Sequence, residues 1–195
     1  MPFRRSTKST ISRLPISSKT GKRSATSGRE KLSFELALAM VVVADTSPIN
    51  YLILIEQIDL LPRLYTRILF PPAVVTELKH PLAPRPVREW ASDTPKWLEV
   101  LSPKESLTLA HLDLGETEAI ALASEMRAEL VLMDERAGRR EAVRRGLRVA
   151  GTLAVLDEAA EAGLVDFDQV VAQLRRTTFR VSKAVISEIM QKRAL

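Results

Sequence analysis

Short, wholly apolar runs alternate with amphipathic stretches along most of this chain, beginning at Val41. The first run, Val-Val-Val-Ala, is rich in β-branched residues, which favours a strand buried on both faces. Strands of this kind occur in parallel sheets that are covered by helices. The sequence therefore predicts an α/β fold of three layers, with a central parallel sheet flanked by helices, over residues 40–195.

The expected elements follow from apolar periodicity and from proline and glycine at their ends. Strands are predicted at 41–44, 67–70, 97–101, 129–134 and 147–150. Helices are predicted from Ser47 onward and at 60–65, 72–78, 87–91, 113–127, 135–145, 153–162, 166–176 and 182–193. The proline-rich stretch 80–96 predicts an irregular connection around a short helix.

Residues 1–39 differ in composition from the rest of the chain. They hold nine basic and two acidic residues, which leaves 20 basic and 22 acidic residues for the remainder. A segment so poor in apolar residues is expected to be disordered. It could be a basic arm for nucleic acid, an organelle transit peptide, or a segment upstream of a functional start at Met40. We favour the third, because the first expected strand needs nothing before Met40.

Composition excludes several kinds of chemistry. The chain has no cysteine, so disulfides, zinc–thiolate sites and a cysteine nucleophile are ruled out. Its two histidines, His80 and His111, leave little room for a histidine-ligated metal centre. The longest apolar run, 36–44, is far short of the roughly 18 residues that a membrane span needs. We expect a cytoplasmic protein with no membrane contact, whose chemistry comes from carboxylates, hydroxyls and basic groups.

Four acids lie at the ends of expected elements. Asp45 and Asp134 follow buried strands, at the sheet edge where open parallel sheets bind ligands. Glu116 lies in the first turn of a helix, and Glu77 lies near the end of another. Taken singly, each is better explained without catalysis: Asp45 as a turn residue, Glu116 by a capping box with Asp113, and Glu77 as part of a solvated helix face.

Taken together, these acids predict a cation site. Two unit charges about 4 Å apart repel by about 4 kcal/mol at an effective dielectric constant of 20. A cluster of three or four carboxylates would therefore destabilise the fold unless a cation offset the repulsion. Ligands that are all oxygen atoms suit Mg²⁺ or Mn²⁺ and a phosphate substrate.

The acids belong to four sequence blocks that share order and spacing with a known family. The blocks are Val-Val-Val-Ala-Asp45-Thr-Ser-Pro-Ile-Asn50, Pro-Pro-Ala-Val-Val-Thr-Glu77-Leu, Leu-Asp-Leu-Gly-Glu116-Thr-Glu118-Ala-Ile and Leu-Val-Leu-Met-Asp134-Glu-Arg-Ala-Gly-Arg. From Met40 to at least Gly163 the chain resembles the PIN-domain family, in particular its prokaryotic branch related to VapC toxins. The resemblance implies a Rossmann-like fold and an Mg²⁺- or Mn²⁺-dependent ribonuclease site.

The resemblance also assigns roles to residues. It implies that Asp45, Glu116 and Asp134 hold one or two metal ions and that Glu77 contributes directly or through water. Many relatives have a Thr-x-Asp motif with a further acid soon after, whereas here Glu135 follows Asp134 at once. Either Glu135 or Glu118 would complete the metal shell.

Other polar residues near these blocks have supporting roles in this interpretation. Thr46 and Asn50 could position the ligands by hydrogen bonds. Arg136 and Arg139 could bind RNA phosphates, while Arg144 and Arg145 are expected on a solvated face. Because aromatic residues make up only 5% of the chain, we expect recognition by backbone and shape rather than by base stacking.

The function expected from these features is a metal-dependent endoribonuclease that acts as the toxin of a toxin–antitoxin pair. Its implied partners are RNA, a small antitoxin protein and a second copy of the chain. One alternative is a PIN-like interaction module with weak or no catalysis. A less favoured alternative is a phosphohydrolase with Asp45 as nucleophile, because Ser47 stands where such enzymes usually have a second aspartate.

Overall fold

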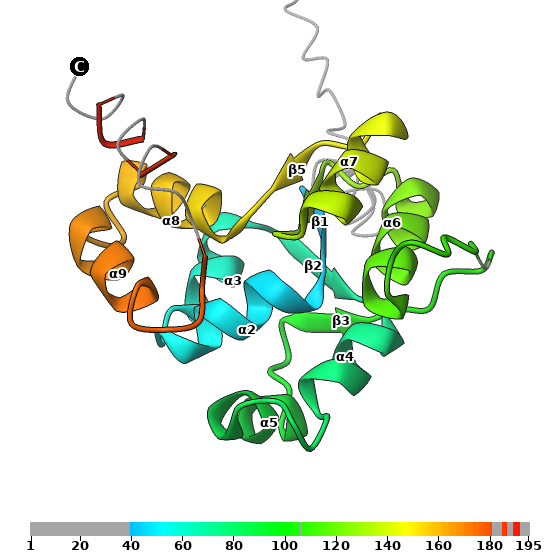
Figure 1. Cartoon of the computed structure of the whole chain (residues 1–195), viewed down its shortest axis with the longest axis horizontal. Helices are drawn as coiled ribbons and strands as arrows, with labels where there is room; N and C mark the ends of the chain where they lie inside the picture. The colour runs from blue at the N-terminus through cyan, green and yellow to red at the C-terminus, as the bar shows by residue number, and fades with distance from the viewer. Residues whose placement is uncertain (1–39, 106, 181–184, 187–188, 192–195) are drawn as a thin grey trace, which may run out of the picture. The chain divides into compact units, whose positions relative to one another are not determined.

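A parallel sheet with helices on both faces forms the centre of the domain that follows residue 39 (Figure 1). The structure is a computed structural model that describes residues 40–105, 107–180, 185–186 and 189–191. Within these residues the sheet has five strands, in the order β3-β2-β1-β4-β5, and every neighbouring pair is parallel. The strands are β1 (Val41–Ala44), β2 (Arg67–Phe70), β3 (Leu98–Val100), β4 (Leu130–Leu132) and β5 (Val149–Ala150). The predicted three-layer α/β fold is confirmed, and the expected tail 1–39 lies outside the described residues.

The helices occur where the apolar periodicity predicts them, with shifts of one or two residues at several ends. They are α2 (Thr46–Leu54), the 3-10 helix η1 (Ile58–Leu60), α3 (Leu61–Leu64), α4 (Pro72–Leu78), α5 (Arg85–Ser92), α6 (Leu114–Met126), α7 (Arg136–Arg144), α8 (Thr152–Glu161) and α9 (Phe167–Leu174). One start was predicted wrongly: Asp45, not Ser47, holds the N-cap position of α2. Of the helix predicted at 182–193, the structure describes only 185–186 and 189–191, which are helical.

Alternate strand residues pack against helices on opposite faces of the sheet. Val42 and Ala44 belong to a core with α2, α8 and α9, whereas Val43 packs with α6 and α7 on the other face. In β4 the same alternation puts Leu132 in the first core and Val131 in the second. This period of two is the geometry of a pleated strand, and it explains why the strands are apolar throughout.

The strand order places a topological switch point between β1 and β4. The chain moves outward from β1 through β2 to β3, then returns to build β4 and β5 on the other side of β1. The two central strands end side by side, and the backbone N–H of Asp45 donates to the carbonyl of Leu132 at 2.9 Å. Open parallel sheets bind their ligands at such a point, beyond the carboxyl ends of the strands.

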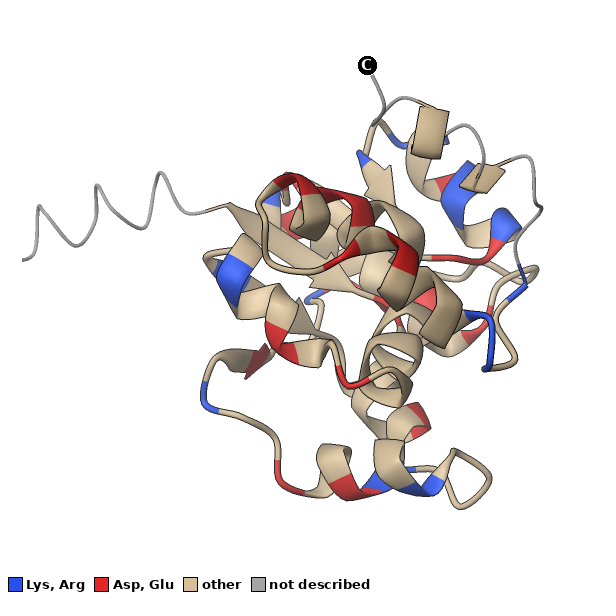
Figure 2. Ribbon diagram, turned by 90° about the vertical axis from the view of Figure 1, so that its left-hand side faces the viewer, with Lys and Arg blue, Asp and Glu red and all other residues tan. Residues whose placement is uncertain are grey.

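Charge of both signs is spread over several elements of the domain rather than confined to one (Figure 2). Within the described part of the chain, no helix combines the length and the apolar character needed to cross a bilayer.

Candidate functional site

Asp45 lies at the switch point and is almost completely buried. It follows β1 directly, is 3% exposed, and its side chain makes no capping hydrogen bond to α2. Burial raises the pKa of Asp45 from its ordinary value of 3.8 to about 8; the neighbouring carboxylates of Asp113, Glu116 and Glu77 add to the rise, and the N–H of Thr46 opposes it. Asp45 is therefore a buried acid close to Asp113, Glu116 and Glu77, whereas Asp134 is not among the charges that raise its pKa.

Glu77 joins two helix starts beside Asp45. Its Oε2 accepts a hydrogen bond from the hydroxyl of Thr46, in the first turn of α2. Its Oε1 accepts from the backbone N–H of Gly115, in the first turn of α6, at 3.1 Å. Thr46 thus contacts Glu77, the residue that it could position. The Glu77 carboxylate is bonded to other parts of the domain, so this residue is not simply on a solvated helix face.

Glu116 has two different oxygen environments. In a capping box its Oε2 accepts from the N–H of Asp113 at 3.2 Å, while Asp113 accepts from the N–H of Glu116 at 2.7 Å. The other oxygen, Oε1, is buried and accepts no hydrogen bond of ordinary geometry, although the N–H of Gly138 is close enough to this carboxylate to oppose the rise of its pKa; the residue is 5% exposed. Burial raises the pKa of Glu116, and the charges of Asp113 and Glu135 add to the rise. The capping and functional interpretations of Glu116 are therefore compatible, because each uses one oxygen.

Asp134 lies two residues beyond β4 and is held by Thr152 at the start of α8. Its Oδ1 accepts from the N–H of Thr152 at 2.8 Å, and its Oδ2 accepts from the hydroxyl at 2.5 Å. Burial raises the pKa of Asp134, while these hydrogen bonds and the charge of Arg139 oppose the rise. Sequence analysis missed Thr152, whose only signal was the Gly-Thr pair after the short apolar run that forms β5.

Three glycines leave the space that three of the acids occupy. A Cβ atom added at any of them would lie within 3.0 Å of a carboxylate oxygen, closer than real Cβ contacts come. The pairs are Gly115 with Glu77 at 2.8 Å, Gly138 with Glu116 at 2.5 Å, and Gly151 with Asp134 at 2.5 Å. Each of these carboxylates therefore packs directly against the backbone of another element at a glycine. A helix cap alone does not need such a glycine.

The remaining candidate residues, Glu118, Glu135 and Asn50, differ in how they lie relative to the four acids. Glu118 accepts from the N–H of Ala73 at 2.9 Å and so caps α4. Glu135 is exposed at the N-cap of α7, and its charge raises the pKa values of both Asp134 and Glu116, so it is near both. Of the two acids considered for the metal shell, Glu135 has the more suitable position. Asn50 makes no hydrogen bond to these acids within the residues that the structure describes.

The arginines of α7 divide into two groups. Arg139 donates to the carbonyl of Met133 at 2.8 Å, and Arg136 shares a pocket with Asp134. By contrast, Arg144 and Arg145 both form ion pairs with Glu141, which is 4% exposed, at 2.6 and 2.7 Å. Both arginines are exposed, as expected for a solvated face, and both also pair with this buried carboxylate.

A cation would have to draw these carboxylates together. In the described residues, no group of three acids or histidines already stands where one ion could bind them all. The donors are nevertheless all oxygen atoms, and one of them, Glu116 Oε1, is buried and accepts no hydrogen bond of ordinary geometry. No lysine or arginine in the described ranges forms an ion pair with Asp45, Glu77, Glu116 or Asp134. The chemistry of the donor set therefore fits a hard divalent cation.

Fold and site together define a class: a parallel α/β domain with acidic side chains at the switch point of its sheet. A family model described as DUF3368: PIN domain matches residues 41–194, and the chain belongs to this family. PIN domains are in general metal-dependent nucleases.

Comparison with individual proteins adds little. The curated proteins contain no match to the chain. Among solved structures it is similar to a PilT N-terminus domain protein from the hyperthermophilic archaeon Sulfolobus solfataricus P2, with 14% identity and a TM-score of 0.41. That match covers 73% of this chain and 100% of the other.

Proposed function

We propose that this protein is a metal-dependent endoribonuclease that hydrolyses RNA phosphodiesters. The observation that carries the proposal is the environment of Asp45. This buried carboxyl is surrounded by the charges of Asp113, Glu116 and Glu77 and has no basic partner within the described part of the chain. Such an arrangement is costly for a fold unless a bound cation offsets it.

Asp45, Glu116 and Asp134 would hold one or two Mg²⁺ or Mn²⁺ ions, and Glu77 would contribute directly or through water. A cation bound there would lower the pKa of a bound water and stabilise charge on the leaving oxygen of the phosphodiester. Thr152 orients Asp134, and Thr46 orients Glu77, so that both carboxylates present oxygens of fixed direction. Arg136 and Arg139 would bind phosphates of the substrate.

One observation keeps the second candidate, a PIN-like interaction module without catalysis, in consideration. The described acids do not stand together as ligands of one ion without rearrangement. The third candidate, a phosphohydrolase with Asp45 as nucleophile, is less favoured because Ser47 stands where such enzymes usually have a second aspartate.

We further propose that the nuclease acts as the toxin of a toxin–antitoxin pair in the cytoplasm, with a small antitoxin protein as partner. This role rests on the resemblance of the four sequence blocks to the VapC branch. Growth arrest on expression of the chain, absent when Asp45 is replaced by Asn, is the result that this role requires.

The nuclease proposal is tested by incubating the full-length chain with mixed single-stranded RNAs. We expect internal cleavage with Mg²⁺ or Mn²⁺ and none with excess EDTA. Cleavage that persists in EDTA would contradict the metal-dependent mechanism. A properly folded protein that cleaves no RNA with either metal would favour the interaction module.

A further inference from the structure

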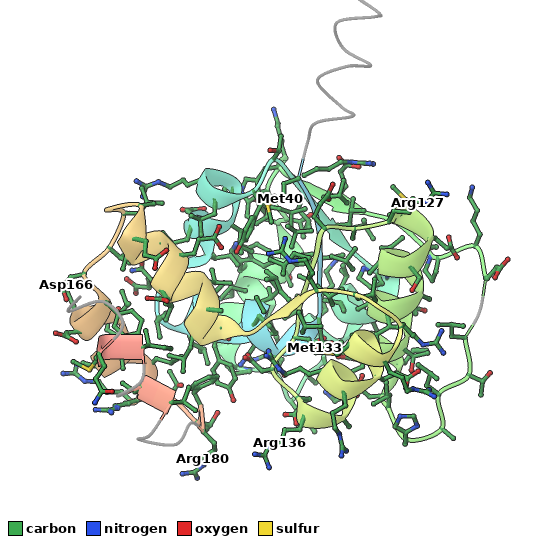
Figure 3. The ribbon with its side chains drawn as sticks, turned by 90° about the horizontal axis from the view of Figure 1, so that it is seen from above. Met40, Arg127, Met133, Arg136, Asp166 and Arg180 are labelled. Carbon is green, nitrogen blue, oxygen red and sulfur yellow. The ribbon has the colours of Figure 1, made fainter. Side chains whose placement is uncertain are left out.

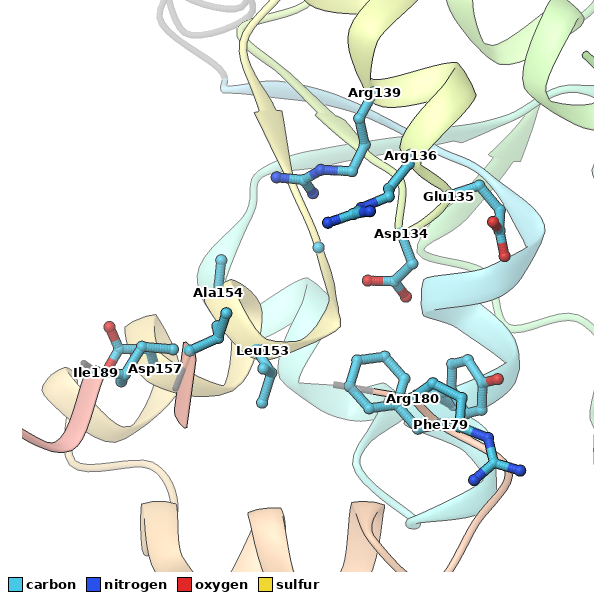
Figure 4. Close-up of a pocket in the computed structure, with 13 residues that line it drawn as sticks. Asp134, Glu135, Arg136, Arg139, Leu153, Ala154, Asp157, Phe179, Arg180 and Ile189 are labelled. Atoms are coloured by element: carbon cyan, nitrogen blue, oxygen red, sulfur yellow. The ribbon is translucent and has the colours of Figure 1, made fainter. Parts of the chain in front are cut away.

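A pocket of about 720 Å³ opens beside Asp134, within the range of small-molecule binding sites. Its walls come from α2, from the β4–α7 turn, from α8 and from the segment after α9 (Figure 4). Because Asp134 also belongs to the proposed metal site, whatever occupies this pocket lies next to the reacting phosphodiester.

One wall of the pocket is aromatic. Tyr51 and Phe179 pack edge to face, with ring centroids 4.9 Å apart and an interplanar angle of 81°. Both rings are half-buried, and the buried Leu153 continues the apolar surface. Aromatic faces of this kind stack on nucleic-acid bases with little preference among them. The low aromatic content of the chain predicted little base stacking. Composition, however, does not show that two rings from distant parts of the chain, Tyr51 and Phe179, meet in this pocket.

The opposite wall carries two arginines, Arg136 and Arg139, beside the acids Asp134 and Glu135. Figure 4 shows Arg136, Arg139 and Asp134 on one side of the pocket and Phe179 and Arg180 on the other, with the guanidinium of Arg180 directed away from Arg136. In the described ranges none of these three arginines forms an ion pair with a carboxylate, unlike Arg144 of the same helix α7. Seen from above, Arg136 and Arg180 lie at the edge of the domain opposite Met40, which precedes β1 (Figure 3). An unpaired guanidinium is suited to bidentate contact with a phosphate.

We propose that this pocket binds one nucleotide of the RNA, next to the scissile phosphate. Its base stacks on the Tyr51–Phe179 pair, and its phosphate is bound by Arg136 on the opposite wall. This inference rests on the proposed nuclease function and adds to it a stacking subsite with weak base preference. A segment of a protein partner is the competing occupant, and it lacks the planar base that the aromatic wall would receive.

The test measures, by calorimetry or NMR, how tightly adenosine 5′-monophosphate and inorganic phosphate bind to the full-length chain without metal. We expect the nucleotide to bind more tightly than phosphate. Phe179→Leu should weaken nucleotide binding about tenfold and leave phosphate binding unchanged, because it removes the ring and keeps an apolar side chain. Arg136→Gln should weaken both ligands, and Tyr51→Phe, which keeps the ring, should bind like wild type.

Arg140→Gln is the matched control for Arg136, since Arg140 is exposed on the same helix and does not line this pocket. Equal binding of nucleotide and phosphate, or unchanged nucleotide binding in Phe179→Leu, would overturn the proposal. RNA cleavage assays distinguish failure of the pocket proposal from failure of the nuclease proposal. Active enzyme whose KM is unaffected by Phe179→Leu would refute the pocket and keep the nuclease, whereas inactive protein with the expected nucleotide binding would refute the nuclease and keep the pocket.

Discussion

Replacement of Asp45 by Asn is expected to reduce metal-dependent RNA cleavage at least a thousandfold, on the order of the loss when a catalytic group is removed. Without metal, the same variant is expected to be more stable than the wild type at pH 8. The first effect follows from loss of a charged metal ligand. The second follows from burial, because Asn is nearly isosteric with Asp and needs no counter-ion.

The sign of the pH dependence follows from the raised pKa of Asp45. Between the ordinary value of 3.8 and the folded value of about 8, the native state binds a proton that the unfolded state releases. The contribution of Asp45 to the free energy of unfolding therefore decreases as pH rises through this window, by at most about 1.4 kcal/mol per pH unit. It is constant below pH 3.8 and above the folded pKa. Asp45→Asn should remove this decrease.

Urea unfolding of the metal-free protein at pH 5, 6, 7 and 8 checks this prediction. The difference in free energy of unfolding between the variant and wild type should increase as pH rises. At pH 8 the variant should be more stable by at least about 2 kcal/mol. Glu118→Gln is the control, since Glu118 caps α4 and lies outside the proposed metal shell: it should lose stability modestly and retain cleavage. Parallel pH profiles for wild type and Asp45→Asn would show that this carboxyl does not have the raised pKa.

Replacement of Gly138 by Ala is expected to impair both folding and metal binding. The new Cβ would lie 2.4 Å from the sulfur of Met133 and 2.5 Å from Oε1 of Glu116. Met133 is fully buried, so the added methyl group must displace the core or the carboxylate. Overpacking of this kind costs about 1–3 kcal/mol, and displacement of a ligand should weaken metal binding by about 10–100-fold.

Gly115→Ala is the matched comparison for Gly138→Ala. Its Cβ would approach only the carboxylate of Glu77, at 2.8 Å. Glu77 is half-buried and can shift at the cost of its hydrogen bonds to Thr46 and Gly115, whereas Met133 and Glu116 are buried and have less room. Thermal unfolding and metal titration of the two variants should therefore rank Gly138→Ala as far more damaging. Equal, mild effects would mean that Glu116 is not fixed by its surroundings.

Local patterns predicted the strands and the two aspartates well. β1 and β2 occupy the residues that the apolar runs mark, because strands buried on both faces must be apolar at every position. Asp45 and Asp134 follow β1 and β4, so parallel pairing alone places them at one edge of the sheet. This is why the fold, and the sheet edge at which the two aspartates lie, could be derived from the sequence.

Contacts between distant segments could not be predicted in the same way. Nothing in the spacing of Glu118 shows that its carboxylate caps α4 rather than facing a metal. Asp113 was seen only as a cap, yet its charge contributes to the raised pKa of Asp45. The pairing of Gly151 with Asp134, and of Tyr51 with Phe179, depends on how helices from different parts of the chain pack on the sheet.

Calorimetric titration of the full-length protein with Mn²⁺ tests the central proposal most directly, with Asp45→Asn as reference. If the acids at the switch point hold a divalent cation, wild type should bind Mn²⁺ with release of a proton. Its affinity should increase up to about tenfold per pH unit between pH 6 and 8, as Asp45 ionises, and the variant should bind far more weakly. Folded wild-type protein that binds no Mn²⁺ at pH 8, or that binds it no better than Asp45→Asn, would contradict the account.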